Sequence, residues 1–120
     1  KEGTSLSEEI TGIAIDSSIW VLGKSGKIYK YNRGESEDYK MSSLISLSSA
    51  SVLRTSDKVN FLAYIADENT VVIYGKDGKI LGKYLFSGTK INDIEIDESN
   101  NGVLVLAEDG NIYEIKDEIF

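Results

Sequence analysis

The chain has 120 residues and a formal net charge of -7, with 41% hydrophobic and 28% charged residues and no cysteine, histidine or proline. Such a chain is long enough to fold as one domain, and it cannot form disulfides, thiolate metal sites or the usual serine and cysteine triads. Its acidic charge predicts no nucleic-acid partner, and its longest apolar run, Phe61–Ala66, is far shorter than the roughly 20 residues of a membrane helix.

The first expected strands are rich in β-branched and aromatic residues and are separated by short polar turns. In chain order they are Thr11–Asp16, the apolar run Ile19–Leu22, the mixed run Lys27–Tyr31 after a Ser25-Gly26 turn, and the outer strand Glu37–Met41. This pattern predicts one antiparallel sheet of four strands.

Two further series of strands repeat the pattern. The second series consists of Ser51–Thr55, Phe61–Ala66, a run from the Asp67-Glu68-Asn69 turn to Tyr74, and Ile80–Phe86 after the Asp77-Gly78 turn. The third consists of Ile91–Asp97, Val103–Ala107 and, after the Asp109-Gly110 turn, Asn111–Lys116. The third series lacks an outer strand, so we expect about eleven strands in all.

The three series align without a gap around their apolar runs. Leu22, Ile65 and Leu106 fall at the same repeat position, at intervals of 43 and 41 residues. Periods of roughly 40 to 50 residues are typical of β-propeller blades. Each apolar run is apolar on both of its faces, which predicts that neighbouring sheets cover both faces. We therefore expect Ile65 and Leu106 to lie in the core.

The predicted fold is all-β. It consists of three consecutive propeller blades, built as four-stranded antiparallel sheets, at residues 10–48, 49–88 and 89–120. Residues 1–9 are a candidate for the strand that completes the third blade, in this chain or in a partner. The chain begins at Lys1, which suggests a processed chain, an excised fragment or an incomplete gene product.

The blades share an alternating strand that ends in Asp, an apolar strand, an Asp-Gly type of turn and a strand that contains Ile-Tyr. In these features, and above all in Ile91–Ile115, the chain resembles the NHL-like and lactonase-like six-bladed propellers of bacteria. The resemblance covers the chain from Ile10 onward and implies a propeller fold. That class contains protein-binding platforms, sugar or peptide receptors and metal-dependent hydrolases, so the resemblance leaves the activity open. The chain departs from the class in having three blades, which puts a complete central channel in doubt.

Carboxylates are the remaining candidates for metal binding. Asp97–Gly102, followed by Glu108, has the oxygen spacing of an EF-hand calcium loop. That loop requires flanking helices, whereas strands are predicted on both sides. A polar hairpin turn is therefore the favoured interpretation.

The resemblance to lactonase-like propellers implies a divalent metal held by carboxylates and amides from several blades. The nearest candidates are Asp16, Asn92, Asp93 and Asp97. Asp and Asn also mark turns and strand ends in any β protein, and the middle unit places Arg54, a cation, near such a site. We therefore nominate no catalytic, metal or cofactor-binding residue and expect no cofactor.

Aromatic residues raise a second question, whether they form a binding surface or a core. Trp20 lies in an apolar inner run, which favours the core over a pocket lining. The tyrosines at matching repeat positions favour a packing role over a carbohydrate platform; they are Tyr29, Tyr31, Tyr74 and Tyr113.

The leading functional hypothesis is a non-enzymatic protein-binding or scaffold module, which engages a protein partner or a second copy of itself. Three blades expose two apolar blade faces, so we expect either a homodimer that builds six blades or upstream blades that are missing from this chain. The alternative is a divalent-metal-dependent hydrolase fragment of lactonase type, whose site other blades would complete. A purely structural repeat domain is a third possibility, and the compartment stays open.

Overall fold

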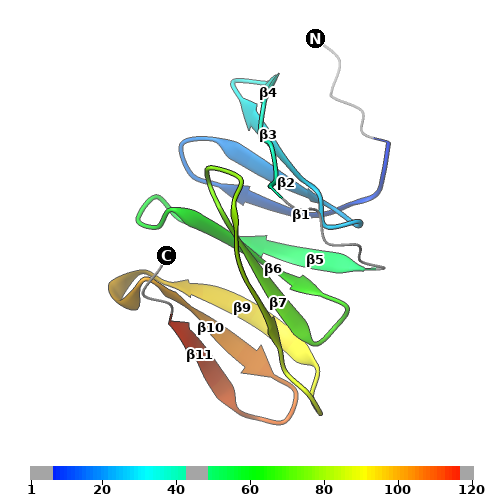
Figure 1. Cartoon of the computed structure of the whole chain (residues 1–120), viewed down its shortest axis with the longest axis vertical. Helices are drawn as coiled ribbons and strands as arrows, with labels where there is room; N and C mark the ends of the chain where they lie inside the picture. Colours follow the sequence, from blue (N-terminus) through cyan, green and yellow to red (C-terminus); the bar gives the residue numbers. More distant parts are fainter. Residues whose placement is uncertain (1–6, 43–48, 117–120) are drawn as a thin grey trace.

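The computed structural model describes residues 7–42 and 49–116, which form three antiparallel sheets (Figure 1). The strands are β1 (Ile10–Ile15), β2 (Ile19–Gly23), β3 (Ile28–Asn32) and β4 (Glu35–Glu37) in the first sheet; β5 (Ala50–Arg54), β6 (Phe61–Ala66), β7 (Thr70–Gly75) and β8 (Ile80–Leu85) in the second; and β9 (Ile91–Asp97), β10 (Gly102–Ala107) and β11 (Ile112–Lys116) in the third. The predicted all-β chain with about eleven strands is confirmed over the described residues. In this part of the chain no helix is long and apolar enough to cross a membrane.

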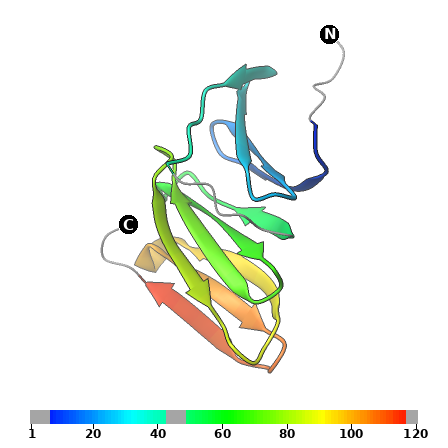
Figure 2. The same ribbon diagram turned by 45° about the vertical axis from the view of Figure 1, so that its right-hand side comes forward.

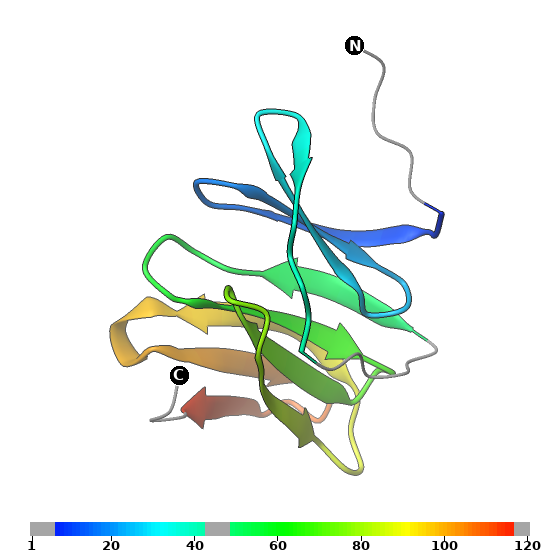
Figure 3. The same cartoon turned by 45° about the horizontal axis from the view of Figure 1, so that its top comes forward.

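The three sheets stack along the longest axis of the molecule, from β1–β4 at one end to β9–β11 at the other (Figure 2). Strand β1 contacts β5, and β5 contacts β9, so the first strand of each sheet lies beside the first strand of the next. The same order of sheets is seen from another direction in Figure 3. Face-to-face stacking of small antiparallel sheets is the arrangement of consecutive propeller blades.

The second sheet is buried on both faces. We call the side of a sheet that faces the preceding sheet its back face, and the opposite side its front face. The back face of the second sheet packs Leu62, Tyr64, Ala66, Val72 and Tyr74 against Trp20, Leu22 and Ile28. The front face packs Phe61, Ala63, Ile65, Val71 and Ile73 against Ile91, Ile94, Val103, Val105 and Ile115. Because side chains alternate along a strand, every residue of β6 and β7 is buried, as the two-sided apolar runs predicted.

Short turns join the strands at residues with a positive φ. Gly26, Gly78 and Gly110 have φ values of 94°, 97° and 90°, and Asp67 and Glu68 have 50° and 70°. Two successive positive φ values are those of a type I′ hairpin, which matches the strand twist. The turns predicted at these positions are therefore confirmed.

The turn between β7 and β8 also holds the segment that leaves the first sheet. Gly78 accepts a hydrogen bond at its carbonyl oxygen from the backbone N–H of Ser42, at 2.7 Å. A Cβ on Gly78 would meet the backbone carbonyl group of Lys40. Only glycine fits this close approach.

Two details differ from the prediction. The outer strand of the first sheet is Glu35–Glu37 rather than Glu37–Met41, because Arg33 and Gly34, with φ values of 55° and 81°, turn the chain directly after β3. Leu106 was expected in the core and is 36% exposed, because it lies on the front face of the third sheet, where the structure places no further sheet.

The N-terminal segment was a candidate for a closing strand. Its described part, residues 7–9, lies beside the first sheet, where the carbonyl oxygen of Glu9 accepts a hydrogen bond from the N–H of Lys24 at 2.9 Å. The remainder of that candidate, residues 1–6, is outside the described residues.

Candidate functional site

The back face of the first sheet is apolar and has no sheet packed on it. The strand register places its side chains in two rows: Ile13, Val21 and Tyr29, and then Ile15, Ile19 and Tyr31. Ile13 and Ile15 on β1 are 59% and 68% exposed, whereas Val21 and Tyr31 are 7% and 9% exposed. A strand with one wet face normally carries polar residues on that face, so this surface is unusual for a solvated sheet.

One end of this back face is covered by Glu8. Its carboxylate accepts hydrogen bonds from the N–H and hydroxyl of Ser25, at 2.9 and 3.0 Å, and from the hydroxyl of Tyr29 at 2.7 Å. Burial opposes ionisation of Glu8, but these hydrogen bonds and nearby Lys27 leave its pKa lowered overall. Burial and the bond to Glu8 raise the pKa of Tyr29 to about 12. The uncovered apolar part of the face therefore lies around Ile13 and Ile15.

The front face of the third sheet is the other uncovered sheet surface in the structure. The register places Asp93, Leu106 and Ile112 in one row, and Glu95, Leu104 and Glu114 in the next. Ile112 is 69% exposed. This face therefore combines exposed aliphatic side chains with carboxylates.

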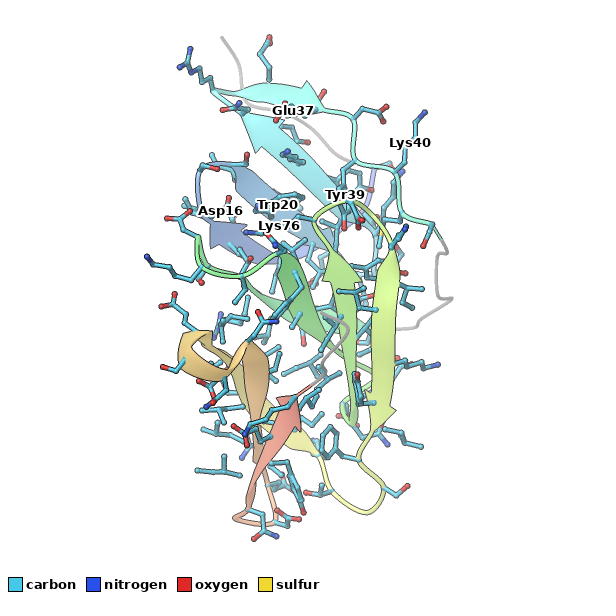
Figure 4. The ribbon with its side chains drawn as sticks, turned by 60° about the vertical axis from the view of Figure 1, so that its left-hand side comes forward. Asp16, Trp20, Glu37, Tyr39, Lys40 and Lys76 are labelled. Carbon is cyan, nitrogen blue, oxygen red and sulfur yellow. The ribbon has the colours of Figure 1, made fainter. Side chains whose placement is uncertain are left out.

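A polar cluster joins the first and second sheets (Figure 4). The side chain of Asp16 is 5% exposed, and its Oδ2 lies 2.6 Å from the Nζ of Lys76. Its Oδ1 accepts hydrogen bonds from the N–H of Ser18 and the indole N–H of Trp20, at 2.7 and 3.0 Å. Burial raises the pKa of Asp16, but the bonds from Lys76, Ser18 and Trp20 outweigh it, and the pKa is lowered overall. Asp16 is therefore ionised, and its ion pair with Lys76 joins the first sheet to the second.

Trp20 belongs to the core, as favoured from the sequence. Its ring meets that of Tyr39 edge to face, with centroids 5.2 Å apart and an interplanar angle of 82°, and the Nζ of Lys30 lies 5.1 Å from its centroid. The hydroxyl of Tyr39 donates to the carbonyl oxygen of Gly75 in the second sheet, at 2.7 Å. These contacts pack the first sheet against the second.

The recurring tyrosines also serve in packing. Tyr74 stacks on Tyr64 with centroids 6.4 Å apart, and Tyr113 lies 5.2 Å from Phe86. Tyr31 and Tyr74 are buried, and Tyr29 and Tyr113 are half-buried. The predicted packing role is confirmed for Tyr31, Tyr74 and Tyr113, whereas Tyr29 donates its hydroxyl to Glu8 on the back face of the first sheet.

Arg54 links the first strands of the second and third sheets. Its Nε donates to the carbonyl oxygen of Ile94 at 3.1 Å, and its Nη2 lies 3.0 Å from Oδ1 of Asp93. A second carboxylate, that of Glu95, lies 3.9 Å away. Arg54 therefore neutralises Asp93, which was a candidate metal ligand.

The four candidate ligands do not converge. Asp16 pairs with Lys76, Asp93 pairs with Arg54, and the exposed Asn92 lies near the start of β9. Asp97 ends β9, and strand geometry separates it from Asp93 by roughly 13 Å. Among the described residues, no group of three or more acidic side chains could hold a metal ion.

The segment with EF-hand spacing is a hairpin connection. Residues Glu98–Asn100 form the 3-10 turn η1 between β9 and β10, and Asn101 adopts a left-handed conformation with a φ of 52°. The amide of Asn100 donates to Oδ2 of Asp97 at 2.9 Å. The strands on both sides exclude the helix-loop-helix, as expected.

One surface hollow lies where the second and third sheets meet. It has a volume of about 270 Å³, and Glu68, Lys90 and Glu108 line it. The Nζ of Lys90 lies 3.3 Å from a carboxylate oxygen of Glu68, and the N–H of Glu108 donates to the carbonyl oxygen of Lys90 at 2.8 Å. Its charged groups are thus partly engaged with one another.

The sequence predicted these uncovered faces, because three blades leave one apolar blade face at each end, and one local signal marks the first of them. Thr11–Asp16 alternates, and the residues on one side of it, Ile13 and Ile15, are aliphatic. The alternation locates an apolar face, but it does not tell whether another sheet of the same chain covers it.

Comparison with known proteins supports the fold. The chain is similar to BamB from Moraxella catarrhalis, a β-propeller, with a TM-score of 0.64 and 19% sequence identity over 94% of this chain and 35% of that one. It is also similar to the computationally designed Ika4 protein, with a TM-score of 0.50 and 12% identity over 96% of this chain and 95% of that one.

The chain thus spans about a third of the length of BamB. No family model and no curated protein sequence matches it. Likeness at these identities shows a β-propeller fold and does not extend to the NHL-like or lactonase-like class.

Proposed function

We propose that this chain is a non-enzymatic, protein-binding module of propeller type. The observation that carries the proposal is the uncovered back face of the first sheet, where Ile13 and Ile15 lie exposed beside Ile19. Contiguous exposed apolar surface marks protein interaction sites in soluble proteins. Covering it releases about 25 cal/mol for each Å² of apolar area removed from water.

The charges around the sheets support a protein partner rather than nucleic acid or a small substrate. The net charge of -7 repels phosphate backbones. Two of the candidate acids, Asp16 and Asp93, are each paired with a cation, so neither is poised to hold a metal or to transfer a proton.

Site-specific photo-crosslinking tests the binding function. A photoreactive residue in place of Ile15 should capture a polypeptide, either a second copy of the chain or another protein, when cells that produce it are irradiated. The matched control is the same residue in place of Leu85, which is 64% exposed at the rim of the second sheet, and this variant should capture none. Equal capture at both positions, or none at either, would contradict a binding role for the back face.

Enzyme assays test the proposal that the chain is not an enzyme. Purified protein should release no product from lactone or phosphoester substrates above buffer with calcium, manganese or zinc present. Turnover that disappears in Asp93→Ala would instead support a metal-dependent hydrolase.

A further inference from the structure

Within the chain, the front face of one sheet packs on the back face of the next sheet, and this contact occurs twice. The two uncovered faces are one front face and one back face of the same kind. Leu22 and Ile65 occupy one repeat position, and each points from the front face of its sheet into the following sheet. The next residue of that series is Leu106, which lies on the uncovered front face of the third sheet.

The back faces follow the same rule. Tyr64 and Val105 occupy the repeat position just before Ile65 and Leu106, and each packs toward the preceding sheet. The equivalent residue of the first sheet is Val21, which is itself 7% exposed and lies in one row with the exposed Ile13 on the back face, where no sheet packs. One chain therefore presents an unused front face and an unused back face of the same internal interface.

We propose that a second copy of this chain covers these faces head to tail. The front face of the third sheet in one copy packs on the back face of the first sheet in the other. This repeats between copies the contact that joins successive sheets within one copy. The inference rests on the proposed binding function and names its partner. The faces differ, so the contact is heterologous, and it closes into a ring or continues into a longer chain according to the rotation between copies.

Charge gives the association a distinct salt dependence. Each copy carries a net charge of -7, so two copies repel each other over their whole surfaces. Apolar side chains drive the contact while like charges oppose it. Because salt screens that repulsion, self-association should become tighter from 0.05 to about 0.5 M sodium chloride, unlike a contact held by ion pairs.

The test uses the full chain and two doubly substituted variants. One blocks the front face with Leu106→Asp and Ile112→Asp, and the other blocks the back face with Ile13→Asp and Ile15→Asp. The control is Leu85→Asp, which adds a charge at an exposed leucine that belongs to neither face. Buried Trp20 reports through its fluorescence that each variant keeps the folded core.

Light scattering and sedimentation should show the unaltered chain and the control at about 26 kDa or more, at least twice the 13.2 kDa of one chain. Each blocked variant should run as a monomer, with self-association weakened at least about tenfold. An equimolar mixture of the two blocked variants should form a 1:1 complex, because one retains the front face and the other the back face.

Three results would overturn the proposal. The first is an unaltered chain that stays a monomer up to millimolar concentration. The second is a front-blocked variant that still dimerises, which would show a symmetric back-to-back contact. The third is a mixture of blocked variants that forms no complex. A monomer whose residue 15 crosslinks a different protein would refute the head-to-tail pairing and leave the proposed binding function standing, whereas a monomer with no crosslink would refute both.

Discussion

The same repeat position is occupied by Leu22, Ile65 and Leu106, but these side chains differ in what covers them. Replacing each with alanine, one at a time, therefore measures how much that covering contributes to stability. Leu22 is fully buried and Ile65 is 4% exposed, each between two sheets, whereas Leu106 has a sheet on one side only. Removing the first two side chains leaves an enclosed cavity, and each should lower the free energy of unfolding by about 2 to 5 kcal/mol.

Leu106→Ala should behave differently in the monomer. Solvent reaches the space that the side chain vacates, so the cavity contribution disappears and only the transfer of partly buried carbons remains. Removing about three carbons at ~0.8 kcal/mol each, scaled by the two thirds of the side chain that is covered, gives about 1 to 1.5 kcal/mol. Leu106→Ala should therefore cost about 2 kcal/mol less than Leu22→Ala or Ile65→Ala.

Urea unfolding followed by the fluorescence of Trp20, at sub-micromolar protein, measures all three changes. The slope of the free energy against urea should stay constant across the variants, so that a shift in midpoint reports stability alone. A Leu106→Ala change as large as that of Leu22→Ala in dilute monomer would refute the assignment of Leu106 to an uncovered face. If copies pair head to tail, the effect of Leu106→Ala should grow with protein concentration, because pairing buries this side chain.

Three further predictions concern the boundary between the first two sheets. Asp16→Asn keeps the acceptor Oδ1 and removes the charge beside Lys76, so it should lower the free energy of unfolding by about 2 kcal/mol. In a double-mutant cycle with Lys76→Met, the paired change should be smaller than the sum of the single ones, and additivity would show that the pair contributes nothing. The folded pKa of Asp16 lies below its unfolded value near 3.8, so its contribution is present above pH 3.8 and is lost as acid protonates the folded side chain. An acid titration of the unfolding midpoint should therefore fall more steeply below pH 4 for the wild type than for Asp16→Asn, and parallel curves would count against the assignment. Gly78→Ala should destabilise by more than about 2 kcal/mol, because a methyl group meets the backbone of Lys40, whereas Gly34→Ala at a similar φ of 81° meets nothing within 4 Å and should change stability by about 1 kcal/mol; equal effects in thermal melts would exclude the close approach as the cause.

Local sequence patterns were sufficient to predict most of the strands and turns. The runs Phe61–Ala66 and Thr70–Gly75 are apolar at consecutive positions, and both strands are buried on both faces. The hairpin at Asp67 and Glu68 follows from residues that tolerate a positive φ. In each case the determining interactions lie within a few residues of one another.

The contacts between sheets had no such local signal. Asp16 and Lys76 are 60 positions apart in the chain, and nothing near either residue identifies the other as its partner. Arg54 was recognised as unfavourable for a metal site, but its pairing with Asp93 depends on how the second and third sheets are placed. The displaced outer strand has a different cause, since the turn that sets its position combines Arg33, a residue with no strong turn preference, with Gly34.

Equivalence in a repeat specifies a direction for each side chain, but not what that side chain meets. Leu22, Ile65 and Leu106 all point forward from their sheets, and only the first two meet another sheet. If the uncovered faces were adapted to water, they should carry polar residues as the solvated side of an antiparallel sheet does. Ile13 and Ile15 stand instead in the same rows as Ile19 and Val21, with the composition of a covered face. The exposed isoleucines therefore have the composition of a face that another sheet covers, as the proposed head-to-tail contact requires.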